Sequence, residues 1–181
     1  KKTLGNFYFS HQNYEKALRI YTAAADMIIE LKLHESDDKG TSPEGAKQLV
    51  IDCLNNASLS QIRLGQYKEA KNTCGKVIQN WDKDNMKALC RAAHASILDG
   101  TFVEAEASIK AALSVHAEDK DALKMQQLYR KKKRQYIETE RKLYSKMASA
   151  FVEKDNSEMS SSDLPSNDYS TGGTGTEYAF S

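Results

Sequence analysis

HQNYEKALRIYTAAAD (11–26), LGQYKEAKNTCGKVIQ (64–79) and DGTFVEAEASIKAALS (99–114) repeat one pattern within a chain of 181 residues. In each segment an aromatic residue is followed three positions later by an alanine, and the alanines are Ala17, Ala70 and Ala105. Helix-forming residues dominate the chain, which has only two prolines. Because short helical repeats bury their apolar faces only by stacking on one another, the pattern predicts an all-α solenoid.

The spacing of the segments is similar to that of the tetratricopeptide repeat, which has a period of about 34 residues. The alanines are 53 and 35 residues apart, so the first step fits that period with an insertion. Small residues occupy one equivalent position of each repeat, as Gly5, Ser58 and Ala93, and we expect paired helices to touch there. The resemblance predicts three helix-turn-helix repeats in a right-handed superhelical solenoid, followed by a long seventh helix.

The expected domain organisation follows from these repeats and from changes in composition. We predict three repeats over 1–117 (about 1–34, 45–82 and 84–117), an inserted loop at 35–44, an extension helix at 118–154 and a disordered acidic tail at 155–181. The predicted helices are 2–11, 14–35, 45–63, 67–80, 84–98, 102–115 and 118–152.

Composition excludes several functions. The net charge is +1, and no apolar stretch is long enough to span a bilayer, so we expect neither nucleic acid nor a membrane as a partner. The three cysteines form no CxxC pair, the four histidines are scattered, and no nucleophile or phosphate-binding motif is present. We therefore expect no catalytic residue, no metal and no cofactor, and a cytoplasmic location with the nucleus as a second compartment.

Five polar residues on the first helices of the repeats are candidates for binding. Lys2 and Asn6 are four residues apart and share one face of a helix, as do Lys87 and Arg91. Asn56 occupies the same repeat position as Arg91, fourteen residues before the repeat alanine. Since equivalent positions of stacked repeats face one groove, we expect the five side chains to converge. Three cations and two amides at one point form a receptor for a carboxylate.

The segments KTLGN (2–6), LNNASLSQIRLGQY (54–67) and KALCR (87–91) resemble the dicarboxylate clamp of co-chaperone tetratricopeptide domains. That family uses K-x3-N, an N in the second repeat, and K-x3-R to hold the C-terminal carboxylates of heat-shock protein 90 or 70. The resemblance implies that Lys2, Asn6, Asn56, Lys87 and Arg91 bind a peptide carboxylate. Asn55 is the alternative to Asn56.

The layout further resembles the C-terminal half of FKBP-type immunophilins, or of large cyclophilins of the same co-chaperone class. The resemblance covers about residues 1–152 and rests on the long first hairpin with its insertion and on RKLYSKM (141–147) in the last helix. It implies a non-enzymatic segment that binds a Glu-Glu-Val-Asp tail and tethers an upstream peptidyl-prolyl isomerase domain. The chain begins with Lys-Lys rather than Met, so we expect a fragment.

Two alternatives remain open. A protein of the aryl-hydrocarbon-receptor-interacting type, with an inactive isomerase-like domain, would have a similar sequence. A general tetratricopeptide scaffold would bind an internal peptide of its partner, without preference for a free C terminus.

The basic run Arg130, Lys131, Lys132, Lys133 and Arg134 lies on the predicted last helix. Some large immunophilins bind calmodulin in this region, and Leu128, Tyr129, Tyr136 and Leu143 could form the required apolar face. The alternative interpretation, which we favour, is a solvated basic surface.

Overall fold

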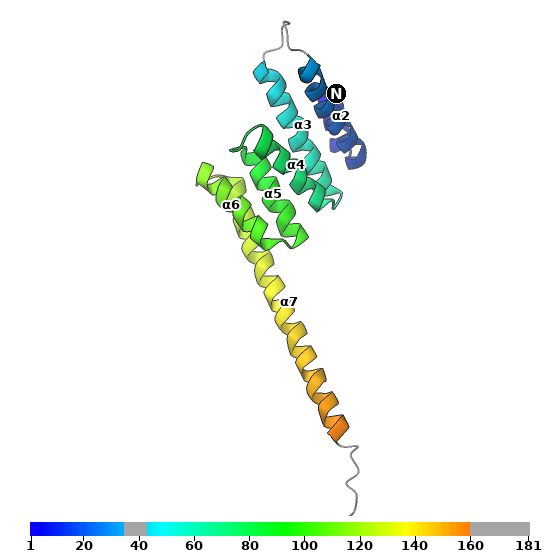
Figure 1. The fold of residues 1–181 in the computed structure, drawn as a ribbon, viewed down its shortest axis with the longest axis vertical. Coiled ribbons are helices and arrows are strands. Elements are labelled where there is room, and N and C mark those ends of the chain that lie inside the picture. Colours follow the sequence, from blue (N-terminus) through cyan, green and yellow to red (C-terminus); the bar gives the residue numbers. More distant parts are fainter. Residues whose placement is uncertain (35–42, 160–181) are drawn as a thin grey trace, which may run out of the picture. The chain divides into compact units, whose positions relative to one another are not determined.

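The computed structural model describes residues 1–34 and 43–159, and within these ranges the regular structure is helical (Figure 1). The helices are α1 (Lys2–Ser10), α2 (Tyr14–His34), α3 (Pro43–Arg63), α4 (Tyr67–Asn80), α5 (Met86–Asp99), α6 (Phe102–Val115) and α7 (Lys120–Met159). The chain divides into two compact units, Lys1–Tyr136 and Ile137–Ser181. The first unit contains α1 to α6 and the start of α7.

The first unit is a stack of three helix pairs: α1 with α2, α3 with α4, and α5 with α6. The repeat alanines lie where the second helix of each pair meets the helix that follows. Ala17 packs with Ala57 of α3, Ala70 with Ala95 of α5, and Ala105 with Tyr129 of α7. All three repeat alanines are completely buried. A methyl group at these positions therefore sets how closely neighbouring repeats approach.

The small residue of each repeat is also buried, at Gly5, Ser58 and Ala93. Gly5 shows why size matters at this position. A Cβ on Gly5 would lie 2.5 Å from Cε1 and 2.8 Å from Cδ1 of Tyr21. The ring of Tyr21 thus fills the space that a side chain on α1 would need, and α1 and α2 approach closely because residue 5 has no side chain.

Tight turns join the two helices of each repeat where the sequence predicts them. Gln12, Gly65 and Gly100 adopt positive φ angles of 59°, 75° and 79°. A left-handed backbone conformation costs little free energy at glycine and more at other residues, so the turn at Gln12 is the least favourable of the three. Each turn reverses the chain within a few residues and keeps the paired helices adjacent.

Several helix ends differ from the prediction, and local capping explains two of them. Helix α5 begins at Met86 rather than 84, because Asn85 is its N-cap and accepts a hydrogen bond from the Ala88 amide. Helix α7 begins at Lys120 rather than 118, because the Asp119 carboxylate accepts hydrogen bonds from the amides of residues 121 and 122.

Two helices extend into segments that the sequence predicts to be irregular, the inserted loop and the tail. Helix α3 begins at Pro43, inside the predicted loop 35–44, and proline is favoured at the first position of a helix. Helix α7 continues past residue 154 to Met159, so residues 155–159 of the predicted disordered tail are helical. The rest of the predicted loop (35–42) and tail (160–181) lies outside the described residues.

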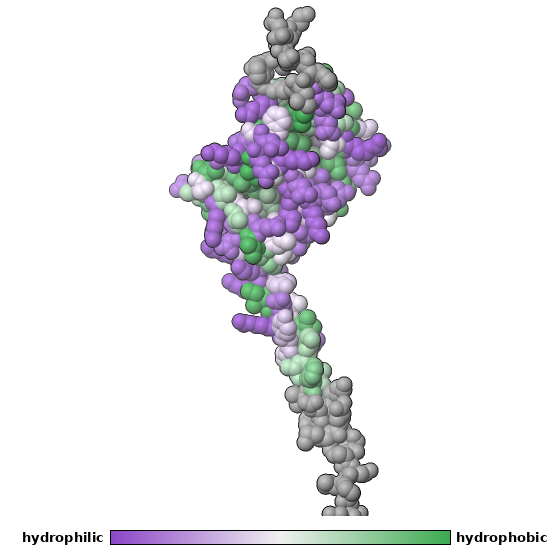
Figure 2. Space-filling view, viewed as in Figure 1, coloured by the Kyte–Doolittle hydropathy of each residue, from purple (hydrophilic) through white to green (hydrophobic). Residues whose placement is uncertain are grey.

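Charged and polar residues cover most of the first unit on the face shown in Figure 2. In the second unit, the described part of α7 has exposed apolar side chains at Leu143, Tyr144, Met147 and Phe151, and Glu138 pairs with Lys142 at 2.9 Å. None of the described helices has the length and apolar character that crossing a membrane requires.

Candidate carboxylate-binding site

The five predicted binding residues lie on α1, α3 and α5, the first helices of the three repeats. Their spacing arranges them by helical turns, because residues four apart lie one above the other on a helix. Asn6, Asn56 and Arg91 define what we call the lower layer. One turn earlier on the same three helices stand Lys2, Asp52 and Lys87, which we call the upper layer.

The structure brings Asn6 and Asn56 into direct contact. Nδ2 of Asn56 donates to Oδ1 of Asn6 at 3.4 Å, and the hydroxyl of Tyr21 donates to the same oxygen at 2.6 Å. Because both bonds end on the oxygen of Asn6, its amide hydrogens point to the other side of the group and can donate to a ligand. Tyr21 is buried in the core, and its hydroxyl also orients Asn6.

A pocket of about 180 Å³ opens beside the paired amides. It is lined by both amides and by the ring of Tyr21, with Phe9, Ser10 and Leu59 completing the wall. Burial raises the pKa of Tyr21, although a hydrogen bond with Asn56 and the charge of Arg91 act in the opposite direction. Tyr21 therefore stays protonated near neutral pH and donates its hydrogen bond to Asn6.

Asn55, the alternative to Asn56, has a structural role. Its side chain is buried, and its Nδ2 donates to Oδ1 of Asn85, the N-cap of α5. Its backbone carbonyl accepts a hydrogen bond from Nη1 of Arg91 at 2.5 Å. This bond fixes the Arg91 guanidinium between α3 and α5, and burial lowers the pKa of Arg91. Of the two neighbouring asparagines, Asn56 is the one beside Asn6.

The upper layer contains an acidic residue that sequence reasoning missed. Oδ2 of Asp52 lies 2.5 Å from Nζ of Lys2, and Oδ1 accepts a hydrogen bond from Nε2 of Gln48 at 3.1 Å. Partial burial acts to raise the pKa of Asp52, but the bonds from Lys2 and Gln48 and the charges of Lys2 and Lys87 outweigh it and lower that pKa. The signal was present in the sequence, because Asp52 precedes Asn56 by the same four residues that separate Lys2 from Asn6.

This arrangement is suited to binding a carboxylate. The lower layer offers two amide groups and a guanidinium, and the upper layer offers two ammonium groups with one carboxylate between them in sequence order. Charge-assisted hydrogen bonds from such donors are about twice as strong as neutral ones. Within the described residues no group of three or more metal-ligating side chains occurs, and burial raises the pKa of Cys90 to about 11, so its thiol is not a nucleophile near neutral pH.

The basic run 130–134 is less uniform than the sequence suggests. Lys133 donates to the hydroxyl of Tyr129 at 2.7 Å and lies 3.8 Å from a carboxylate oxygen of Glu106 on α6. Leu128 and Tyr129 pack in the core formed with α6, and the ring of Tyr136 lies 5.4 Å from that of Phe102. Most of the apolar face predicted to meet calmodulin therefore contacts the repeats, whereas the remaining basic side chains of the run are exposed.

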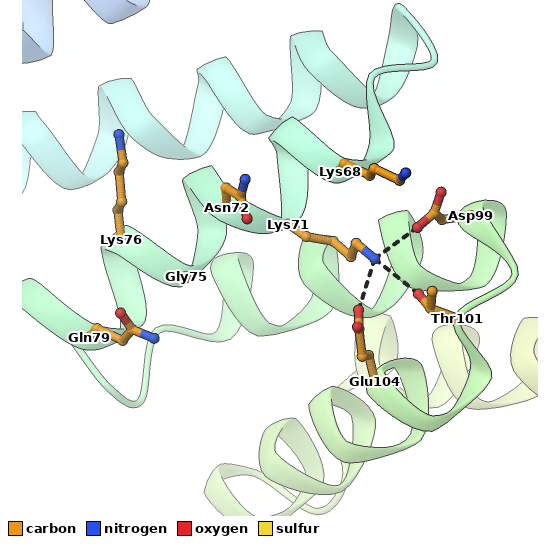
Figure 3. Close-up of a pocket in the computed structure, with 9 residues that line it drawn as sticks. All are labelled: Lys68, Lys71, Asn72, Gly75, Lys76, Gln79, Asp99, Thr101 and Glu104. Atoms are coloured by element: carbon orange, nitrogen blue, oxygen red, sulfur yellow. Dashed lines mark hydrogen bonds and ion pairs between the residues drawn. The ribbon is translucent and has the colours of Figure 1, made fainter.

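A larger pocket of about 670 Å³ lies between α4 and the turn from α5 to α6 (Figure 3). Nζ of Lys71 lies in it at 2.8 Å from carboxylate oxygens of both Asp99 and Glu104, and it donates to Thr101 at 3.1 Å. Lys71 and Asp99 are mostly buried. These contacts fasten the second repeat to the third, so we interpret this cluster as structural.

Comparison with known proteins agrees with the fold and with the immunophilin resemblance. No family model matches the chain. Over 154 residues it is 25% identical to the bovine (Bos taurus) peptidyl-prolyl cis-trans isomerase FKBP4, covering 85% of this chain and 32% of that protein. It is 23% identical to the FK506-binding protein 59 of Drosophila melanogaster, covering 85% of this chain and 33% of that protein. The chain thus spans about a third of the length of these relatives.

Solved structures with the same fold include three tetratricopeptide or co-chaperone proteins. One is the C-terminal tetratricopeptide domain of a Plasmodium falciparum protein described as FK506-binding (TM-score 0.62, 24% identity, 77% of this chain and 88% of that one). Another is the Hsp90 co-chaperone Cns1 of Saccharomyces cerevisiae (0.66, 18%, 87% and 46%). The third is the second such domain of human RPAP3, solved with the HSP70 peptide SGPTIEEVD (0.54, 21%, 71% and 91%). The chain is an all-α tetratricopeptide solenoid similar to the corresponding domains of FKBP-type immunophilins and co-chaperones.

Proposed function

We propose that this chain is a co-chaperone interaction domain that binds the acidic C-terminal tail of heat-shock protein 90 in the clamp formed by Lys2, Asn6, Asn56, Lys87 and Arg91. The observation that carries the proposal is the contact between Asn6 and Asn56, with Tyr21 holding the same oxygen. The contact places two neutral donors from different repeats at one point, and Arg91 lies on the adjacent helix. A terminal carboxylate fits such a donor set.

The tail of heat-shock protein 70 is the closest competing ligand, because it has the same terminal carboxylates. RPAP3 was solved with such a peptide, and Cns1 is an Hsp90 co-chaperone. The proposed clamp binds the terminal carboxylates, which both tails have. Preference between them would depend on contacts with earlier peptide residues, and titration of both tails in parallel measures it.

The domain is proposed to act by delivery rather than by chemistry. The relatives it matches include a peptidyl-prolyl cis-trans isomerase about three times its length. We propose that a parent protein of this kind would use the repeats to bring its isomerase domain to heat-shock protein complexes in the cytoplasm. The repeats would contribute affinity for the chaperone tail and no catalytic group.

Calorimetric titration with the peptide SGPTIEEVD tests the proposal, because its end is the Glu-Glu-Val-Asp sequence. Lys87→Ala should weaken binding by roughly 1.5–3 kcal/mol, the range for hydrogen bonds to charged groups. Lys87 is exposed, so its replacement should leave the stability of the domain unchanged. Lys110→Ala is the matched control, because Lys110 is an exposed lysine of α6 paired with Glu106 outside the clamp.

Equal affinities of the wild type, Lys87→Ala and Lys110→Ala would contradict the proposal. Binding should also weaken as salt is added, because exposed charges are screened. A general scaffold that recognises an internal peptide would instead bind with no dependence on the end of the ligand.

A further inference from the structure

Asp52 occupies a position in the clamp where a carboxylate of the ligand would be expected. Both of its oxygens have partners within the domain, with Oδ2 at 2.5 Å from Nζ of Lys2 and Oδ1 bonded to Gln48. The side chains of Lys2 and Asp52 are 35% and 29% exposed. Solvent therefore screens their ion pair only in part, and the two side chains are free enough to separate. In the free domain, one cation of the proposed clamp is thus already bound to a carboxylate of the same chain.

The register of the helices puts Asp52 among the binding residues rather than beside them. It lies one turn from Asn56 on α3, as Lys2 lies one turn from Asn6 on α1 and Lys87 lies one turn from Arg91 on α5. Asn56 and Asn6 touch in the lower layer, and Asp52 and Lys2 touch in the upper layer. The charge of Lys87 also acts to lower the pKa of Asp52, so both upper-layer cations stabilise the charged form of this carboxylate.

A peptide carboxylate that approaches Lys2 therefore meets two obstacles. The ammonium group already donates to Asp52, and the negative charge of Asp52 repels a second carboxylate at the same point. The ammonium has three donors, so a ligand carboxylate in the upper layer either shares Lys2 with Asp52 against this repulsion or draws Lys2 away from Asp52. The lower layer has no acidic member, so a carboxylate held by Asn6, Asn56 and Arg91 meets no such competition.

We propose that Asp52 is an internal competitor of the ligand, which occupies Lys2 in the free domain and limits the affinity of the clamp for acidic peptides with a second carboxylate. This inference rests on the proposed function of the clamp. It makes Asp52 a determinant of specificity. Ligands whose carboxylates bind in the lower layer alone are less affected by Asp52 than ligands that must also engage Lys2.

The test is a calorimetric titration of the peptide SGPTIEEVD into the wild type and Asp52→Asn at low and high salt. Asp52→Asn keeps the shape of the side chain and removes its charge. It should tighten binding about twofold to fivefold at low salt, the range expected when a partly exposed ion pair no longer competes. The gain should shrink at high salt. Asp26→Asn removes the same charge from an exposed position on α2 and should change affinity less than twofold.

Two further variants locate the effect. Asp52→Ala should also tighten binding, and circular dichroism will show whether each variant is folded. In a Lys2→Ala background the gain from Asp52→Asn should be smaller, because Lys2 is no longer there to be released and only the repulsion between Asp52 and the ligand remains. Unchanged binding by folded Asp52→Asn would overturn the inference, and weaker binding would overturn it by showing that Asp52 orients Lys2 for the ligand. A gain of equal size in the Lys2→Ala background would overturn it too.

The inference and the proposed function fail in different ways. If the wild type binds the free-acid peptide no better than its C-terminal amide, the carboxylate clamp is wrong. If the wild type prefers the free acid but Asp52→Asn gives no gain, the clamp stands and the role of Asp52 is wrong.

Discussion

Replacing Gly5 by alanine should destabilise the domain, although alanine is the better helix former. Gly5 is buried in α1, and a Cβ there would lie 2.5, 2.8 and 3.0 Å from three ring carbons of Tyr21. The ring cannot move away easily. Tyr21 is 1% exposed, and its hydroxyl is fixed at 2.6 Å from Oδ1 of Asn6. The clash must therefore be relieved by moving α1 relative to α2.

The expected magnitude follows from two opposing effects. Overpacking of a close-packed core costs about 1–3 kcal/mol. Replacing a helical glycine with alanine returns roughly 0.5–1 kcal/mol. At the middle of both ranges, the free energy of unfolding should fall by about 1 kcal/mol, and the melting temperature by about 2–4 °C. Because Tyr21 also holds Asn6, affinity for the peptide should fall as well.

Gly75 in α4 provides the matched control for this substitution (Figure 3). A Cβ on Gly75 would have no atom within 4 Å apart from its own helix backbone and adjacent residues. Gly75→Ala should therefore stabilise the domain by up to about 1 kcal/mol. Thermal and urea unfolding followed by far-ultraviolet circular dichroism compare the two variants. If Gly5→Ala is as stable as the wild type, or more stable, the packing argument for the first repeat is wrong.

Three other predictions concern the candidate site, the loss of stability at low pH and the turn at Gly100. Arg91→Ala should reduce both peptide affinity and melting temperature, because the Arg91 guanidinium also donates to the carbonyl of Asn55. Lys87→Ala should reduce peptide affinity alone. Equal melting temperatures for the two variants would contradict this difference. Hydrogen bonds from Lys110 and Tyr129, with the nearby lysine charges, lower the pKa of Glu106 from 4.5 to about 2. The contribution of Glu106 to stability should therefore be complete above pH 4.5 and be lost as the pH falls from 4.5 towards 2. Melting temperatures of Glu106→Gln and the wild type across that window test the sign, and parallel curves would refute it. Gly100→Ala should cost about 1 kcal/mol, because φ is +79° there, and an unchanged urea midpoint would contradict the strain.

The repeat architecture could be predicted because its determinants are local in sequence. Ala17, Ala70 and Ala105 are each buried beside the next helix of the stack, so one pattern repeated along the chain specifies three similar interfaces. The errors at helix starts have equally local causes. The prediction included residue 84 in a helix that begins after Asn85, because the periodicity of apolar residues does not show which polar side chain caps the helix.

The candidate site could be predicted as a set of donors but not as a set of contacts. The spacing of the clamp residues is visible in the sequence. Lys2 and Asn6 are four residues apart, as are Lys87 and Arg91, and Asn56 occupies the same repeat position as Arg91. The ion pair between Lys2 and Asp52 was missed although the spacing of Asp52 from Asn56 was visible, because the two residues are fifty positions apart and an acidic residue is not expected in a receptor for carboxylates. The same holds for Lys133, whose bonds to Tyr129 and Glu106 depend on how α7 packs on α6.

The comparison that tests the central claim most directly is the titration of the peptide SGPTIEEVD as a free acid and as its C-terminal amide. Amidation changes one group and removes the charge that the lower layer is proposed to hold. The clamp predicts that the amide binds at least tenfold more weakly, because a hydrogen-bonded charge contributes roughly 1.5–3 kcal/mol. Equal affinities for the two peptides would contradict the clamp and would favour a scaffold that recognises an internal sequence.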